Sequence, residues 1–212
     1  MARVDFKPRS DAARHLKQIA CRLFAERGVD GVTVREIAEA AGQKNHAAVG
    51  YHFGSKEALI RELVLDGAML IDARRNAMLD ALERRQRVTV RGVCEVLIRT
   101  SIELEGSGLE DSYNRFVVML SMTHRDVLMA ALDGRWNSGY TRCLDHLRSL
   151  APDMSAARKT ERLVFLGAYL GSVLSGREAA LADDSREHPT WGSPEALDNF
   201  ATTMAAIIEA KP

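Results

Sequence analysis

The chain has 212 residues, and its 29 basic and 29 acidic side chains cancel. A chain of this length can bury a core without disulfides or metals, and its three cysteines form no C-x-x-C pair, which argues against a zinc ribbon and a secreted disulfide scaffold. The first ten residues contain no apolar signal-peptide core, and the longest uncharged stretch, residues 163–176, is shorter than the about 20 apolar residues of a membrane span. The sequence therefore predicts a cytoplasmic protein with no membrane partner.

The charge is unevenly distributed along the chain. Residues 1–56 hold ten Lys or Arg and six Asp or Glu, a net charge of +4, so the remainder carries −4. A basic end joined to an acidic body is typical of a module that binds a polyanion. The first residues include Arg3, Lys7 and Arg9, which would either form a basic arm along a DNA groove or simply solubilise the terminus.

Few prolines, little strand-like alternation and apolar side chains at three- and four-residue spacing predict an all-α fold of about nine helices. The first three helices are expected over residues 10–27, 33–41 and 45–53. The second would begin with a capping box, in which the Thr33 hydroxyl caps the Glu36 amide and the Glu36 side chain reaches back. Gly42 would end it, so the second and third helices form a candidate helix-turn-helix.

A long helix from Ser55 to about residue 82 would join this unit to the rest of the chain. Segments containing glycine or proline separate five further helices, expected over residues 89–105, 111–122, 126–150, 156–182 and 194–210. The predicted domains are residues 1–56, with the helix-turn-helix, and residues 57–212, a helical body.

Residues 33–59, TVREIAEAAGQKNHAAVGYHFGSKEAL, resemble the signature of the TetR family of bacterial transcription regulators. In that family an R-x-I-A-x-x-A-G helix precedes a recognition helix that ends in Y-H-F and is followed by S-K-E-x-L. The resemblance covers about residues 10–60 and implies a three-helix DNA-binding domain on a helical ligand-binding and dimerisation domain. The segment between Gly42 and His52 is one residue longer than the commonest family pattern, which leaves the register of the recognition helix on the bases open.

Three residues at the start of the recognition segment are candidate base readers: Lys44, Asn45 and His46. In a major groove, lysine can donate to guanine and asparagine can pair with adenine through two hydrogen bonds. The alternative for each residue is a solvated turn. Arg35 would reach a guanine or a phosphate, or else pair with Glu39 at i+4 on the helix surface.

The resemblance also implies contacts to the DNA backbone, from Thr33, Tyr51, His52 and Lys56. The positive end of the helix dipole disfavours a cation near a helix N-terminus. The presence of Lys56 there is therefore better explained if a phosphate group lies nearby. Tyr51 has an alternative role, since aromatic residues in short helices usually pack inward. Gly50 stands where many members have an aromatic residue; it lowers helix propensity by about 1 kcal/mol relative to Ala, and it would allow close approach of the sugar-phosphate backbone.

In the body, large adaptable side chains could line an apolar ligand pocket, and these are Phe116, Met119, Met122, Trp136 and Tyr140. Ordinary core packing is the alternative for each of them. Further candidate polar anchors are Asn114, Arg115 and His124.

Gly167 and Gly171 place small residues at i and i+4 of an apolar helix, where another helix can approach closely. The partner helix is either intramolecular or part of a second subunit. The resemblance favours the dimer interface, because the last two helices of each family member usually form a four-helix bundle.

These features predict a ligand-responsive transcription regulator, and we expect it to be a repressor. It would bind a pseudo-palindromic DNA operator as a homodimer, and a small, largely apolar effector would release it from the DNA. The sequence is also compatible with an activator. The competing hypotheses are a small helical enzyme with a histidine-centred site and an interaction protein that keeps the helix-turn-helix only for packing. The sequence has no G-x-S-x-G, P-loop, Rossmann or H-E-x-x-H motif, so we predict no enzyme, no catalytic residue, no metal site and no cofactor.

Overall fold

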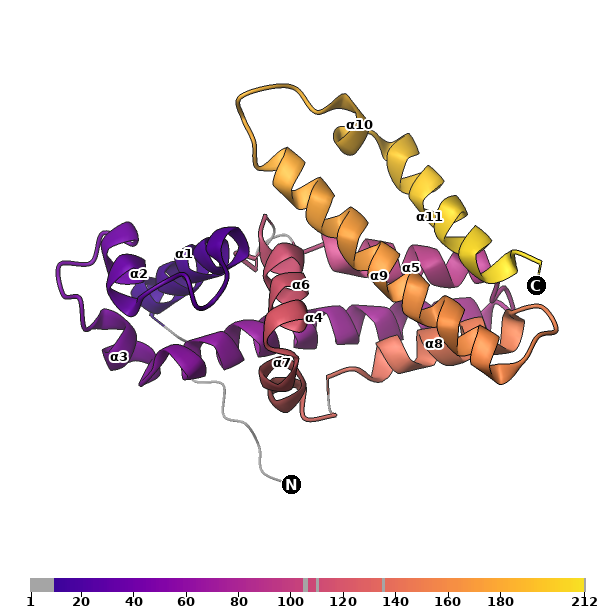
Figure 1. Cartoon of the computed structure of the whole chain (residues 1–212), viewed down its shortest axis with the longest axis horizontal. Helices are drawn as coiled ribbons and strands as arrows, with labels where there is room; N and C mark the ends of the chain where they lie inside the picture. The colour runs from indigo at the N-terminus through magenta and orange to yellow at the C-terminus, as the bar shows by residue number, and fades with distance from the viewer. Residues whose placement is uncertain (1–9, 105–106, 110, 135, 212) are drawn as a thin grey trace.

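The structure is a computed structural model that describes residues 10–104, 107–109, 111–134 and 136–211. Within those ranges the chain forms eleven helices and no strand, which confirms the predicted all-α fold (Figure 1). The basic arm predicted in residues 1–9 lies outside the described residues. No helix in the described part of the chain is long and apolar enough to cross a bilayer.

The three N-terminal helices lie close to the predicted ranges. α1 (Asp11–Arg27) begins at Ser10, whose hydroxyl caps its first turn, and ends at Gly28, where φ is 71°. A glycine adopts this positive φ without steric cost, so it stops the helix where the sequence predicts. α2 (Val34–Ala40) and α3 (Ala48–Phe53) follow.

α4 (Lys56–Arg84) has 29 residues and extends from the N-terminal helices along the body (Figure 1). Its first half buries Leu59 and Leu63 in one hydrophobic cluster, and its second half buries Leu79 in another. The boundary predicted after residue 56 falls in the first turn of this helix. The division into two domains therefore stays a prediction. The first cluster contains side chains of α1, α2 and α3 together with side chains of the body helices.

The body contains seven further helices, which are α5 (Val90–Ile102), α6 (Tyr113–Thr123), α7 (Arg125–Leu132), α8 (Ser138–Leu150), α9 (Ala156–Leu181), α10 (Pro189–Gly192) and α11 (Pro194–Glu209). The single helix predicted over residues 126–150 is wrong, because α7 and α8 are separate. Asp133 lies in the left-handed region with φ of 46°, and Gly134 follows with φ of 64°. Aspartate is one of the few residues that tolerate this conformation, so the helix can end there.

α6 joins the N-terminal helices to the body. It packs most extensively on α1 on one side and on α9 on the other. Phe116 of α6 stacks on Phe24 of α1 with ring centroids 6.1 Å apart. The first cluster combines side chains of α6 and α7 with those of α1 to α4, so the N-terminal core is completed by the body.

Tyr113, the first residue of α6, is held against α4. Its hydroxyl donates to the Val64 carbonyl oxygen over 2.9 Å. Burial raises the pKa of Tyr113, which keeps this donor protonated. Its ring lies so close to Gly67 that a Cβ there would overlap three atoms of the ring. Glycine at this point of α4 is therefore required by the tyrosine ring.

We expect Gly67→Ala to destabilise the protein by about 1–3 kcal/mol, because the methyl group overpacks the core against Tyr113. Urea unfolding followed by circular dichroism measures the change. Gly176→Ala on α9 is the matched control, since the new Cβ would lie 3.8 Å from the Trp191 ring, an ordinary contact. The control should gain up to about 1 kcal/mol from helix propensity. Equal free energies of unfolding for the two variants would contradict the proposed packing.

Candidate DNA-binding surface and interhelical cavity

The helix-turn-helix of α2 and α3 has a turn of defined geometry. The Gln43 amide donates to the Ala38 carbonyl oxygen over 2.9 Å, and the Gly42 amide donates to the Glu39 carbonyl oxygen over 3.0 Å. Gly42 has φ of 65°. These two bonds and the positive φ define a Schellman motif, which satisfies the last carbonyl groups of α2 and fixes the direction of the chain toward α3.

The predicted capping box is present at the start of α2. The Thr33 hydroxyl accepts from the Glu36 amide over 3.2 Å, and the Glu36 carboxylate accepts from the Thr33 amide over 2.8 Å. The bonds from Thr33, together with a 2.8 Å bond from the Arg27 guanidinium, lower the pKa of Glu36 to about 2. The box therefore fixes the N-terminus of α2 and ties it to α1.

The third helix begins at Ala48, three residues later than the sequence predicts. The reason is Asn45, whose side-chain oxygen accepts from the Ala47 amide over 2.9 Å. Asparagine commonly makes this local turn, which competes with helix. The bond uses one of the two lone pairs of the Asn45 side-chain oxygen, so it restrains the orientation of the amide group that would contact adenine.

The nine predicted DNA-contacting residues come from α2, α3, the turn between them and the first turn of α4, at one end of the molecule (Figure 1). We call these nine residues the DNA-binding surface. Seven are exposed, namely Thr33, Arg35, Lys44, Asn45, His46, Gly50 and Tyr51, and two are half-buried, namely His52 and Lys56.

Gly50 and Tyr51 do not pack into the core of the described chain. A Cβ at Gly50 would meet nothing within 4 Å, so the fold does not require glycine there. The Tyr51 side chain is 84% exposed, so the inward packing considered from the sequence does not occur. The flanking residues Val49 and Phe53 are buried and anchor α3 to the core. The outer face of α3 is thus held rigidly and left open.

Arg35 makes the i+4 ion pair that was the alternative to a DNA contact. Its Nε lies 2.8 Å from Glu39 Oε1, and His46 Nε2 lies 3.5 Å from the same oxygen. The Arg35 hydrogen bond lowers the pKa of Glu39. All three side chains are exposed, and exposed ion pairs contribute little to stability. A phosphate group can therefore replace the carboxylate at low cost.

A cavity of about 220 Å³ lies among α4 to α9, and we call it the interhelical cavity. Its apolar walls include Ile71, Val117, Leu132 and Leu170. Its polar groups come from residues that include Arg75, Ser101, Asn114 and Tyr140.

The structure brings two of the five predicted pocket residues, Trp136 and Tyr140, together at this cavity. Met122 is exposed and lines a neighbouring groove between α6, α8 and α9. Phe116 lies in the core against α1. Met119 faces the N-terminal helices too, since its Cγ is 3.9 Å from the position of a Cβ at Gly28. α6 thus has a cavity face and an α1 face, and the two residues on the α1 face do not line the cavity.

Gly167 and Gly171 also lie at the interhelical cavity, on the intramolecular side of α9. A Cβ at Gly167 would stand 3.1 Å from the Tyr140 hydroxyl, and one at Gly171 would stand 3.1 Å from a methyl group of Val118. Their small size thus serves close packing inside the chain. The exposed apolar side chains of α9 are other residues, among them Val164 and Phe165.

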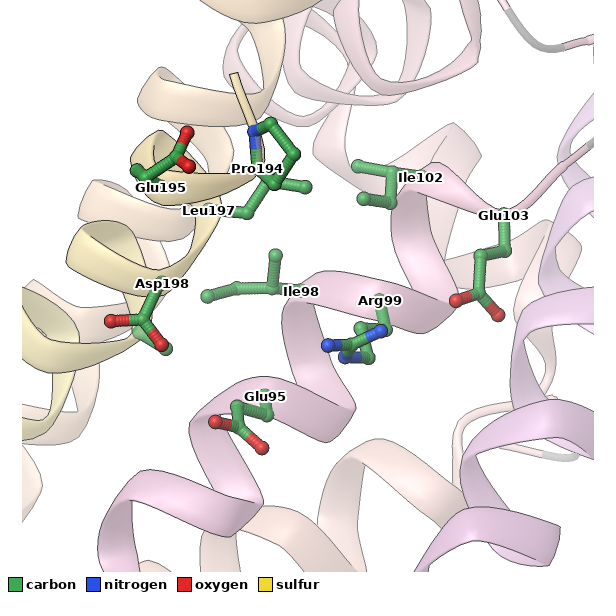
Figure 2. A pocket seen from close by; sticks show the side chains of 10 residues that line it. Glu95, Ile98, Arg99, Ile102, Glu103, Pro194, Glu195, Leu197 and Asp198 are labelled. Atoms are coloured by element: carbon green, nitrogen blue, oxygen red, sulfur yellow. The ribbon is translucent and has the colours of Figure 1, made fainter. Parts of the chain in front are cut away.

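A second hollow, of about 440 Å³, is a groove between α5 and α11 (Figure 2). Ile98, Ile102 and Leu197 are its large apolar side chains, and Glu95 and Asp198 lie at its side. The carboxylates of Glu95 and Asp198 are both bound by the same guanidinium, that of the neighbouring Arg91. We assign no ligand to this groove.

Comparison with known proteins identifies a matching family model and several partial relatives. Residues 18–63 match the model of a family described as bacterial regulatory proteins, tetR family. The chain is 36% identical over 105 residues to the HTH-type transcriptional repressor KstR2 of Rhodococcus jostii, which covers 47% of this chain and 46% of that protein. It is 36% identical over 78 residues to the HTH-type transcriptional repressor AcnR of Corynebacterium efficiens, covering 37% of this chain and 34% of that protein. The matches thus span less than half the length of these relatives.

Solved structures share the fold along nearly the whole chain. A TetR family transcriptional regulator, PfmR from Thermus thermophilus, superposes with a TM-score of 0.56 at 17% identity over 93% of this chain and 99% of that one. A bacterial regulatory protein in the tetR family from Rhodococcus RHA1 gives a TM-score of 0.59 at 15% identity over 96% and 100%. The likeness to these structures is one of fold, with a helix-turn-helix at one end of a helical body. Residues 18–63 are thus similar to the tetR family, and they include most of the segment in which the sequence signature predicted this resemblance.

Proposed function

We propose that this protein is a transcription regulator, acting as a repressor, that binds operator DNA through the DNA-binding surface and releases it when a small molecule occupies the interhelical cavity. The observation that carries the DNA-binding role is the exposed pair Gly50 and Tyr51 on an otherwise anchored helix. The named relatives are transcriptional repressors, and we propose no enzymatic activity.

The chemistry of the DNA-binding surface fits a phosphate backbone and a major groove. Tyr51 presents a phenol hydroxyl, which can donate to a phosphate, and Gly50 lets the sugar-phosphate backbone approach α3. Lys44 lies before α3 and Lys56 lies after it, so cations flank the helix on both sides. We retain Lys44, Asn45 and His46 as candidate base readers, with the Asn45 side chain oriented by its bond to the Ala47 amide.

The route from the cavity to the DNA-binding surface passes through α6. Its cavity face carries Asn114 and Val117. Its other face packs on α1 through Phe116, and just beyond its end His124 Nε2 lies 3.2 Å from the Asp30 carboxylate, in the loop before α2. A ligand that displaces α6 would therefore move the N-terminal helices with it.

We propose that two copies of the chain pair through the exposed face of α9 and α11. The adjacent side chains of Val164 and Phe165 on α9 are 63% and 57% exposed, and grouped exposed apolar side chains can mark an interaction site. The two helices pack on each other, and Tyr169 of α9 hydrogen-bonds Thr203 of α11 over 2.8 Å. A two-fold dimer would present two copies of α3 to the half-sites of a pseudo-palindromic operator.

Lys56→Ala should weaken binding to all DNA sequences and reduce the slope of log affinity against log salt by about one, since one phosphate contact is lost. Fluorescence anisotropy at several salt concentrations, with an operator duplex selected from a random library, measures this. Arg158→Ala is the matched control, because it removes one exposed positive charge on α9. The control should keep the wild-type slope. A wild-type slope for Lys56→Ala would remove this lysine from the interface, and failure to select any duplex would refute the DNA-binding role.

Phe165→Glu should convert a dimer into a monomer, because it places a charge in the proposed apolar interface. Sedimentation velocity distinguishes the two states. Met129→Glu introduces the same charge at an exposed apolar position of α7 and should leave the dimer intact. A dimer that persists in Phe165→Glu would place the subunit interface elsewhere.

A further inference from the structure

We propose that the ligand of the interhelical cavity is an amphipathic carboxylic acid whose carboxylate binds the Arg75 guanidinium. The inference rests on the proposed function in one respect, namely that this cavity receives a small molecule. It adds the chemical class of that molecule and the residue that selects it.

Arg75 of α4 lines the cavity with most of its hydrogen-bonding capacity unused. Its Nη2 donates to the Ser101 hydroxyl over 2.9 Å. Its Nε is shielded from solvent and has no hydrogen-bond partner among the described residues. The guanidinium carbon lies 5.6 Å from the centre of the Tyr140 ring, close enough for a cation–π contact. The ring thus helps to hold a guanidinium that still has donors to offer.

The carboxylate nearest in sequence, that of Asp72, favours the charged form of Arg75 through its charge but makes no hydrogen bond to it. Asp72 lies one turn earlier on α4, but its Oδ1 accepts from the Gly139 amide over 2.7 Å and its Oδ2 accepts from the Ser138 hydroxyl over 2.8 Å. It therefore binds the first turn of α8. Burial lowers the pKa of Arg75, and nearby groups that include Asp72 oppose this shift without cancelling it, as expected for a cation whose charge is compensated incompletely.

A carboxylate would supply the hydrogen-bond acceptors and the negative charge that Arg75 lacks. The Nε and Nη groups of an arginine form a planar fork that can donate two parallel hydrogen bonds to the two oxygens of a carboxylate. A neutral ligand would leave the charge unmatched, and a cationic ligand would be repelled. The apolar walls formed by Ile71, Val117 and Leu170 would receive the remainder of the molecule.

The cavity volume indicates the size of the acid that the cavity itself can hold. About 220 Å³ corresponds to roughly seven water molecules at about 30 Å³ each. Linear or aromatic acids of roughly seven to ten non-hydrogen atoms match this space. Hexanoate, octanoate, benzoate and phenylacetate are suitable probes.

Trp136 lines the cavity and reports binding without DNA. The chain has two tryptophans, so Trp191→Phe leaves Trp136 as the single tryptophan, whose fluorescence can be excited selectively above the tyrosine absorption. Each of the four acids and its matching primary amide is titrated near neutral pH. We expect at least one acid to change the Trp136 fluorescence and to bind about tenfold or more tightly than its amide, as a charge-assisted hydrogen bond implies.

Arg75→Gln should abolish the preference for the acid over the amide. Arg74→Gln is the matched control, because it removes the neighbouring arginine of α4, which is not among the residues that line the cavity, and it should keep the preference. Arg75→Lys retains the positive charge but lacks the planar fork of donors, so it should keep part of the preference for the acid over the amide. Circular dichroism checks that each variant folds, and if Arg75→Gln does not fold, Arg75→Lys carries the test.

Three results would overturn the proposal: acids and amides bind equally to the wild type, no acid binds at millimolar concentration, or Arg75→Gln keeps the preference for the acid. The proposed function fails separately. If an acid binds through Arg75 but operator affinity does not change, the carboxylate site stands and its regulatory role is refuted.

Discussion

The arrangement of the molecule depends on one buried carboxylate. Glu178 of α9 accepts from the backbone amides of Asn114 and Arg115 over 2.9 and 2.8 Å, and from the Asn114 side chain over 2.7 Å. These amides lie in the first turn of α6, where helices leave donors unsatisfied. Burial raises the pKa of Glu178, and the hydrogen bonds oppose that rise. The carboxylate thus ties the start of α6 to α9, and from there α6 places Tyr113 on α4 and Phe116 on α1.

The position of α6 explains how one chain could combine the proposed DNA-binding role with a ligand in the interhelical cavity. The helix separates the two, with the cavity on one face and α1 on the other. α4 also belongs to both parts, since Arg75 lies at the cavity while Asp66 and Glu62 pair with Lys17 of α1. Packed helices shift between discrete arrangements rather than deforming continuously, so a ligand that moves α4 or α6 would reposition the N-terminal helices as a unit.

Local signals made the helix-turn-helix predictable, because the capping box and the glycine stop of α2 involve residues close in sequence. Two helix boundaries were predicted wrongly. The turn made by the Asn45 side chain delays the start of α3, and the left-handed conformation of Asp133 divides α7 from α8. Periodicity shows which residues share a helix face but not what that face contacts, so Phe116 and Trp136 were grouped although they lie on different sides of α6. Arg75 was missed because its partners come from distant helices.

The central claim is that the interhelical cavity and the DNA-binding surface are energetically coupled. The direct test is a pair of calorimetric titrations with a carboxylic acid that binds in the interhelical cavity. The acid is titrated into the free protein and into the protein saturated with operator DNA. Coupling of the usual size predicts that operator DNA lowers the affinity for the acid about 5- to 150-fold, and linkage requires the acid to lower operator affinity by the same factor. Equal affinities for the acid in the two titrations would contradict the account.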